Sequence, residues 1–135
     1  ERDLPAIIHN RESHADLLKT VTAVGPLPKG GVMHCYSGSA ELARDFMELD
    51  YYISFAGPVT FKNARRLPQV AASIPKERLL CETDSPYLSP EPYRGKKNEP
   101  ARVVVVARRL AQLLNYELEE LAPILTANTE RLFNL

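Results

Sequence analysis

The sequence predicts an α/β fold in which helices cover a parallel sheet, and three observations support this prediction. Short apolar segments alternate along the chain with segments of helical periodicity. The apolar segments are nearly continuous, as is typical of strands that are buried on both faces of a parallel sheet. In addition, His9, His34 and Asp84 each follow such a segment, at spacings of 25 and 50 residues, which indicates a repeating strand–helix unit.

The first half of the chain contains three expected strands, at residues 6–9, 32–36 and 51–56. Between the first two, apolar residues recur at helical spacing over residues 12–24, and a loop rich in glycine and proline follows. Before the third strand, a helix is expected over residues 39–49, where the hydroxyl of Ser39 can cap a free backbone N–H. Gly57 and Pro58 close the third strand.

The second half contains the fourth expected strand, over residues 78–83, and a long loop rich in proline over residues 85–99. Loops of this length in a compact domain are usually functional or disordered. Pro68 is expected to interrupt the helix before this strand, and Pro123 to strain the first of the last two helices. The expected helices of this half span residues 64–73, 101–114, 118–125 and 126–133.

A repeat of about 25 residues is typical of the strand–helix unit of a TIM barrel, whose active residues lie at the carboxyl ends of the strands. A complete (β/α)8 barrel needs eight such units and about 250 residues. The 135-residue sequence contains four units, does not begin with methionine and leads almost directly into a strand. We therefore expect residues 1–135 to be the C-terminal half of a single TIM-barrel domain and a piece of a longer chain.

The composition is that of an ordinary globular domain, with 44% apolar and 25% charged residues. Lys and Arg number 17, as do Asp and Glu, which argues against nucleic-acid binding by bulk charge but leaves room for a local basic rim. No apolar run approaches the roughly 20 residues that span a membrane. The two cysteines, Cys35 and Cys81, are expected to be buried free thiols, which favours a reducing, cytoplasmic location.

Three strand ends carry residues suited to a divalent metal in a hydrolase, namely His9, His34 and Asp84. Asp84 is also the expected catalytic residue, because a carboxylate can accept a proton from an activated water. Glu82, two residues earlier, is expected on the same side of its strand, where it would orient a ligand or form a structural ion pair. Cys35 is expected to face away from His34 and to pack in the core.

The most concentrated basic segment outside a predicted helix contains Arg94, Lys96 and Lys97. Opposite the metal it would hold substrate phosphates, and the alternative is a solvated loop. Ser37 and Gly38 precede a helix, where free amides would cradle a phosphate or simply cap the helix.

Other polar and aromatic residues near the strand ends give weaker signals. Arg11 and Lys62 are secondary candidates for anion binding, whereas His14, which has no strand-end partner, is expected at the surface. Three aromatic residues either stack on bases or pack in the core: Tyr36, Phe61 and Tyr87.

Five stretches together resemble the TatD family of metal-dependent deoxyribonucleases. They are residues 5–11 (PAIIHNR), 33–38 (MHCYSG), 80–88 (LCETDSPYL), 93–100 (YRGKKNEP) and 128–133 (NTERLF). The resemblance implies a TIM barrel of the metal-dependent hydrolase type that cleaves phosphodiester bonds, typically as a 3′ to 5′ exonuclease on single-stranded DNA. It also implies divalent metal ions, with magnesium expected and zinc or manganese as alternatives, and it places His9, His34 and Asp84 at metal-ligand positions.

The resemblance also implies metal ligands that this sequence does not contain. The family uses a His-x-His pair on its first strand and a glutamate from the middle of the barrel, and this sequence has no His-x-His pair. We therefore expect the isolated chain to be inactive and, because its apolar strand edges are open, to self-associate. D-aminoacyl-tRNA deacylation or another amidohydrolase-type reaction is the alternative on the same barrel. A non-catalytic folding or interaction unit is the alternative of another class.

Overall fold

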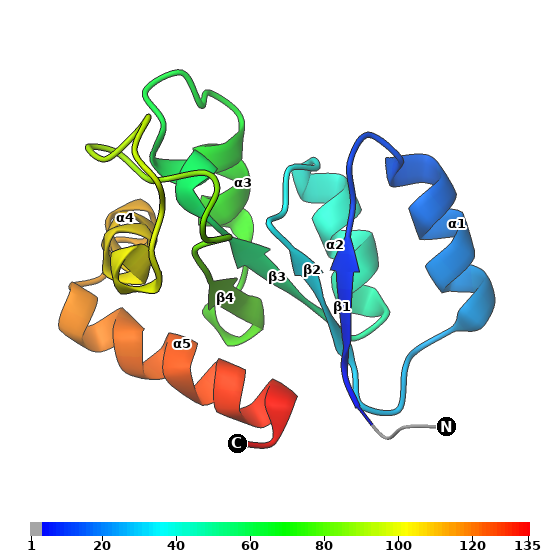
Figure 1. The fold of residues 1–135 in the computed structure, drawn as a ribbon. Coiled ribbons are helices and arrows are strands. Elements are labelled where there is room, and N and C mark those ends of the chain that lie inside the picture. Colours follow the sequence, from blue (N-terminus) through cyan, green and yellow to red (C-terminus); the bar gives the residue numbers. More distant parts are fainter. Residues whose placement is uncertain (1–3) are drawn as a thin grey trace.

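The computed structural model describes residues 4–135, which form a four-stranded parallel sheet with helices packed against it (Figure 1). The strands lie in the order β1-β2-β3-β4, so each pairs with its neighbours in sequence. Their bounds are Ala6–His9 for β1, Gly31–His34 for β2, Tyr51–Phe55 for β3 and Leu79–Cys81 for β4. The predicted parallel α/β fold is confirmed.

Within residues 4–135, five α-helices and three short 3-10 helices connect and follow the strands. The α-helices are α1 (His14–Val24), α2 (Ala40–Glu48), α3 (Leu67–Ser73), α4 (Val103–Leu114) and α5 (Leu118–Phe133). The 3-10 helices are η1 (Gly57–Thr60), η2 (Lys76–Arg78) and η3 (Pro100–Arg102). Ser39 caps α2 as predicted, because its hydroxyl oxygen accepts a hydrogen bond of 3.2 Å from the backbone N–H of Leu42.

Two expectations about the helices that contain prolines are wrong, namely the interruption at Pro68 and the division of residues 118–133 into two helices. Pro68 lies in the first turn of α3, where a missing N–H breaks no helical hydrogen bond, so it starts this helix and does not interrupt it. Pro123 lies inside α5, which runs continuously from residue 118 to residue 133. Glu117 and Glu120 begin α5 with a reciprocal capping box, and packing against β4 and η2 supports the helix despite the proline.

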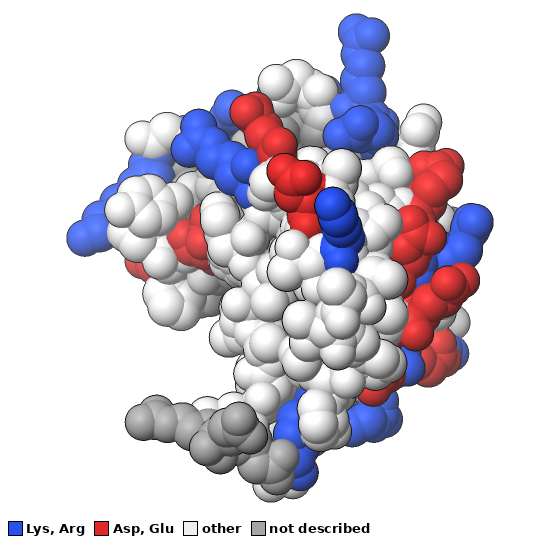
Figure 2. Space-filling view, turned by 90° about the vertical axis from the view of Figure 1, so that its right-hand side faces the viewer, with Lys and Arg blue, Asp and Glu red and all other residues white. Residues whose placement is uncertain are grey.

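The two faces of the sheet are packed unequally. The face toward the helices holds the main core, in which Phe46, Ile53 and Phe55 are fully buried. The opposite face carries a small cluster, in which Val32, Tyr52 and Leu80 are buried beneath the end of α5. On that face the side chain of Ile7 is 63% exposed. Figure 2 shows the corresponding hollow on its left side, lined mainly by uncharged atoms.

β3 ends one residue earlier than predicted, whereas β2 and β4 each end two residues earlier, which changes how the site is built. β2 ends at His34 because Cys35 has a positive φ of 46°, which takes the chain out of the extended conformation. β4 ends at Cys81, so Glu82 and Asp84 lie in the following loop, where Asp84 also has a positive φ, of 57°. Strand alternation therefore does not determine the directions of these three side chains. No helix within residues 4–135 is both long and apolar enough to cross a membrane.

Candidate metal and active site

The parallel register of β1 and β2 brings two predicted site histidines together. His9 is the last residue of β1 and pairs directly with His34, the last residue of β2. Their imidazole ring centroids are 5.7 Å apart. Both side chains lie at the carboxyl edge of the sheet, where a barrel carries its active residues.

The loop after β4 brings two carboxylates to His34, one to each ring nitrogen. Glu82 Oε2 contacts His34 Nδ1, and Asp84 Oδ1 lies 3.3 Å from His34 Nε2. The other oxygen of Glu82 accepts a hydrogen bond of 2.8 Å from the backbone N–H of Cys35. Glu82 therefore fixes the imidazole ring through Nδ1, while Asp84 lies next to Nε2, the other ring nitrogen.

This arrangement fits part of a divalent metal site. Ligand atoms at about 2.1 Å from one ion lie about 3.0–3.4 Å from each other, which matches the distance between His34 Nε2 and Asp84 Oδ1. A carboxylate at the other histidine nitrogen, the position of Glu82, is the usual second partner of a metal-ligating imidazole. Within residues 4–135, no three His, Cys, Asp or Glu side chains are grouped closely enough to hold a metal ion by themselves. The residues that the structure describes thus offer only part of a donor set.

A cavity of about 430 Å³ lies beside these residues, and both His9 and Asp84 line it. Its cationic lining comes from Arg11 and Arg66. Arg66 Nη2 donates a hydrogen bond of 3.1 Å to the backbone carbonyl of Ser37, which fixes its guanidinium at the cavity. Arg66 precedes α3, far in sequence from any strand end, so no motif in the sequence identified it. Arg11 directly follows the end of β1, which is the signal that made it a secondary candidate.

Two further residues line the cavity, although the sequence predicts one of them at the surface and the other in the core. His14, expected at the surface, is half-buried at the start of α1 and lines the cavity. Cys35, expected in the core, also lines it, because the chain turns after His34. Burial, together with the nearby carboxylates of Glu82 and Asp84, raises the pKa of the Cys35 thiol to about 12. Cys35 is therefore a protonated thiol at neutral pH.

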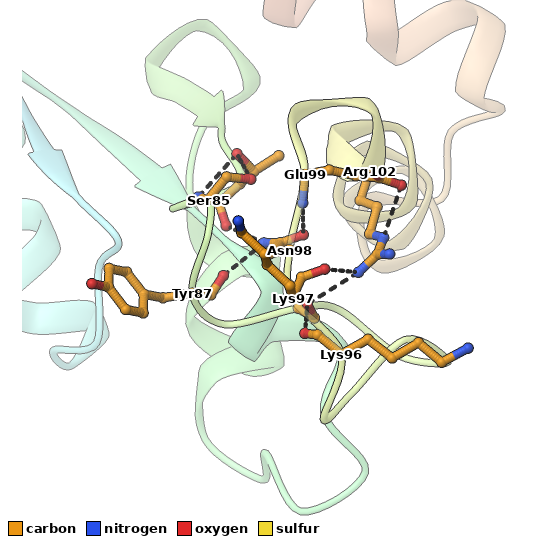
Figure 3. A network of polar contacts seen from close by, with 9 residues as sticks. Ser85, Tyr87, Lys96, Lys97, Asn98, Glu99 and Arg102 are labelled. Atoms are coloured by element: carbon orange, nitrogen blue, oxygen red, sulfur yellow. Dashed lines mark hydrogen bonds and ion pairs between the residues drawn. The ribbon is translucent and has the colours of Figure 1, made fainter.

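The structure places the predicted basic loop outside this cavity. Arg94, Lys96 and Lys97 are exposed, and none of them lines it. The guanidinium of Arg94 lies 3.8 Å from the ring centroid of Phe61, and its Nη1 donates a hydrogen bond of 3.4 Å to Asn63 Oδ1. The side chain of Lys96 points away from Ser85 and Tyr87 (Figure 3).

Ser37 and Gly38, the two predicted supporting residues before α2, have different surroundings. Ser37 lines the cavity and accepts the hydrogen bond from Arg66. Gly38 instead makes room for Tyr36, because a Cβ at Gly38 would collide with the phenol oxygen that donates a hydrogen bond of 2.7 Å to the carbonyl of Ser39. Tyr36 is 4% exposed and is therefore a packing residue.

Cys35 and Cys81 are both free thiols, as predicted, but they are half-buried, not fully buried as expected. Burial, followed by the nearby charge of Glu82, raises the pKa of Cys81 to about 11. Both thiols are therefore protonated at neutral pH.

The family model described as "TatD related DNase" matches residues 1–134. The chain is 49% identical over 135 residues to the uncharacterized metal-dependent hydrolase YabD of Bacillus subtilis and 45% identical to YcfH of Escherichia coli. The match covers all of this chain, but only 53% of YabD and 51% of YcfH. The chain thus spans about half the length of the curated relatives it matches.

The solved structures agree with the sequence comparisons. YJJV, a TatD homologue from Escherichia coli, superposes with a TM-score of 0.92 at 35% identity, over 98% of this chain and 51% of that chain. A TatD-family hydrolase from Entamoeba histolytica shows the same fold with a TM-score of 0.81 at 22% identity. The predicted fold class, four strand–helix units amounting to about half of a barrel, is confirmed. Because the family model matches nearly every residue, the chain belongs to the TatD family.

Proposed function

We propose that this chain supplies the C-terminal half of the active site of a metal-dependent deoxyribonuclease, which shortens single-stranded DNA from its 3′ end. The observation that carries the proposal is the environment of the His34 imidazole, in which Glu82 contacts Nδ1 and Asp84 lies next to Nε2. The match to the family model for TatD-related DNases supports DNA as the substrate. The expected location is the cytoplasm.

In this proposal His9, His34 and Asp84 hold the divalent ions together with ligands from the N-terminal half. Bound metal, with magnesium expected and zinc or manganese as alternatives, would polarise a phosphoryl oxygen and lower the pKa of a water molecule. Asp84 orients the attacking water and accepts its proton. Glu82 fixes the tautomer and direction of the His34 ring.

The substrate contacts in this proposal come from two places. Arg11 and Arg66 line the cavity beside Asp84 and would contact the phosphate nearest the scissile bond. Arg94, Lys96 and Lys97 lie farther out and would contact the backbone of the strand beyond it. Tyr87 is 70% exposed just after Asp84, so its ring is available to stack on a base.

The test compares the 135-residue chain with a full-length barrel, in which this chain follows the N-terminal half that its relatives carry. We expect metal-dependent shortening of a 3′-ended single-stranded DNA oligonucleotide by the full-length barrel and none by the chain alone. The readout is the ladder of shortened products on a denaturing gel, with chelator added as the control. Activity of the chain alone would contradict the proposed division of the site.

A substrate panel separates this function from its alternatives. D-aminoacyl-tRNA deacylation and amidohydrolase reactions use the same kind of activated water, but neither shortens a DNA oligonucleotide. Release of a D-amino acid or cleavage of an amide, without DNA shortening, would replace the nuclease assignment. A full-length barrel that is inactive on every substrate would favour a folding or interaction role.

We also propose that the isolated chain self-associates through its open sheet. β1 and β4 are edge strands, and Ile7 exposes 63% of its surface on the poorly covered face. We expect sedimentation velocity to show dimers or larger species that increase with concentration, and Ile7→Lys to reduce them by placing a charge on that face. An unaltered chain that stays monomeric at high micromolar concentration would contradict this expectation.

A further inference from the structure

The loop that carries Asp84 is held by one buried side chain, that of Asn98, which is only 4% exposed. Its amide nitrogen Nδ2 donates two hydrogen bonds of 2.7 Å, one to the backbone carbonyl of Thr83 and one to that of Tyr87. These two carbonyls lie on either side of Asp84. Figure 3 shows Asn98 at the centre of this network.

The side-chain oxygen and the backbone N–H of Asn98 are also bonded. Its backbone N–H donates to the carbonyl of Pro86 at 3.0 Å, and its Oδ1 accepts from the backbone N–H of Glu99 at 2.9 Å. A buried amide with all of its bonds made specifies one conformation, because any other leaves polar groups unpaired. Asn98 therefore determines the path of the backbone from Thr83 to Tyr87.

This backbone path needs support from outside, because Asp84 has a positive φ of 57°. Non-glycine residues occupy this region at a cost, although aspartate tolerates it better than most. Within the turn, the N–H of Tyr87 donates a hydrogen bond of 2.9 Å to the carbonyl of Asp84. The donors of Asn98 hold the two ends of the turn and so keep the carboxylate at His34 Nε2.

Two other side chains, those of Ser89 and Arg102, join the segment after this turn to the basic loop. Ser89 Oγ donates a hydrogen bond of 2.6 Å to the carbonyl of Lys96, and Arg102 Nη1 donates one of 2.8 Å to the carbonyl of Lys97. Arg102 Nη1 also donates to Ser89 Oγ at 3.1 Å. The backbone that leads into Asn98 is thus tied to the segment that follows Asp84.

We propose that Asn98 is a positioning residue, whose two amide hydrogen bonds aim Asp84 at the metal and the attacking water. This role rests on the proposed function, but it acts on metal affinity and can be measured without any DNA. Removing a partner that orients a metal ligand typically lowers metal affinity by 10–100-fold. We expect a loss of that size when the donors of Asn98 are removed.

The chain contains a matched control at the opposite end of β4. Asn128 is 2% exposed, and its amide nitrogen also bonds two backbone carbonyls, those of Lys76 at 2.6 Å and Leu79 at 2.9 Å. These carbonyls lie at the amino end of β4, away from Asp84. Loss of this amide removes the same kind of interaction without touching the site.

The test measures Mn²⁺ affinity by calorimetry, and thermal unfolding by circular dichroism, in the full-length barrel. Asn98→Ala should bind Mn²⁺ at least tenfold more weakly, whereas Asn128→Ala should lower the melting temperature similarly and keep its affinity within twofold. Asn98→Asp, which has the same size but lacks the N–H donors, should behave as Asn98→Ala does, and it replaces that variant if the alanine variant does not fold.

Equal Mn²⁺ affinity in the unaltered protein and in a folded Asn98 variant would overturn the positioning role. A similar loss of affinity in Asn128→Ala would also overturn it, because general destabilisation would then explain both. A failure of the nuclease assignment has a different signature, in which the unaltered protein binds Mn²⁺ but cleaves no DNA. An unaltered protein that binds no Mn²⁺ would overturn the metal site and the positioning role together.

Discussion

Asp84→Asn should reduce kcat/KM for DNA cleavage by the full-length barrel by about 10³-fold, the scale expected for removal of a general base. The amide has the size of the carboxylate, but it cannot accept the proton of the attacking water and is a weaker ligand for a divalent cation. The measurement is the initial rate of oligonucleotide shortening at saturating magnesium. Turnover within a few-fold of the unaltered protein would contradict the assignment of Asp84.

The fold should survive this substitution. Asparagine tolerates the positive φ of Asp84 as well as aspartate does, so the turn can keep its backbone conformation. The melting temperature should therefore change little while the activity is lost. Asp16→Asn, an exposed position on α1, is the matched control and should leave both the rate and the melting temperature unchanged.

Gly57→Ala should destabilise the isolated chain by about 3 kcal/mol, at the upper end of the range for overpacking. A Cβ at Gly57 would overlap the backbone carbonyl oxygen of Leu88 and lie 3.1 Å from the backbone nitrogen of Pro90. Backbone atoms cannot move aside as the end of a flexible side chain can. The segment after Asp84 would therefore have to separate from η1, which follows the third strand.

Gly95→Ala is the control for this substitution, because it makes the same change at an exposed position in the loop that Gly57 contacts. Gly95 has a positive φ of 84°, but a Cβ there meets no atom within 4 Å. It should therefore cost only about 1 kcal/mol, from the unfavourable backbone conformation. Urea denaturation followed by circular dichroism measures both variants, and equal losses would show that the contact with Leu88 carries no special weight.

Hydrophobic pattern predicts the sheet well, because near-continuous apolar runs have few alternatives to a buried parallel strand. The errors arise where a single backbone torsion or tertiary packing decides the outcome. The positive φ values of Cys35 and Asp84, which the pattern does not encode, end β2 and lead the chain out of β4. Pro123 misleads for the other reason, since packing of α5 outweighs its local preference to break a helix.

The site residues likewise fall into those that the sequence predicts and those that depend on tertiary contacts. His9 and His34 were predicted to lie together because equivalent positions on adjacent parallel strands meet at one edge, and the register confirms that they pair. Arg66 and Asn98 were not predicted to contribute, because each acts through contacts with residues distant in sequence. Arg66 reaches Ser37, 29 positions away, and Asn98 reaches Thr83, 15 positions away. Residue spacing alone contains no signal for either contact.

The two buried asparagines have a consequence for how the sheet opens. β4 has only three residues and lies at an edge, where strands usually fray first and exchange their amide hydrogens fastest. The side chain of Asn98 is hydrogen-bonded to the backbone just beyond one end of β4, and the side chain of Asn128 is hydrogen-bonded to the backbone at the other end. Fraying from either end must break hydrogen bonds that a buried asparagine makes to the backbone, so the strand that leads to Asp84 is protected from local opening even though one of its sides is bare.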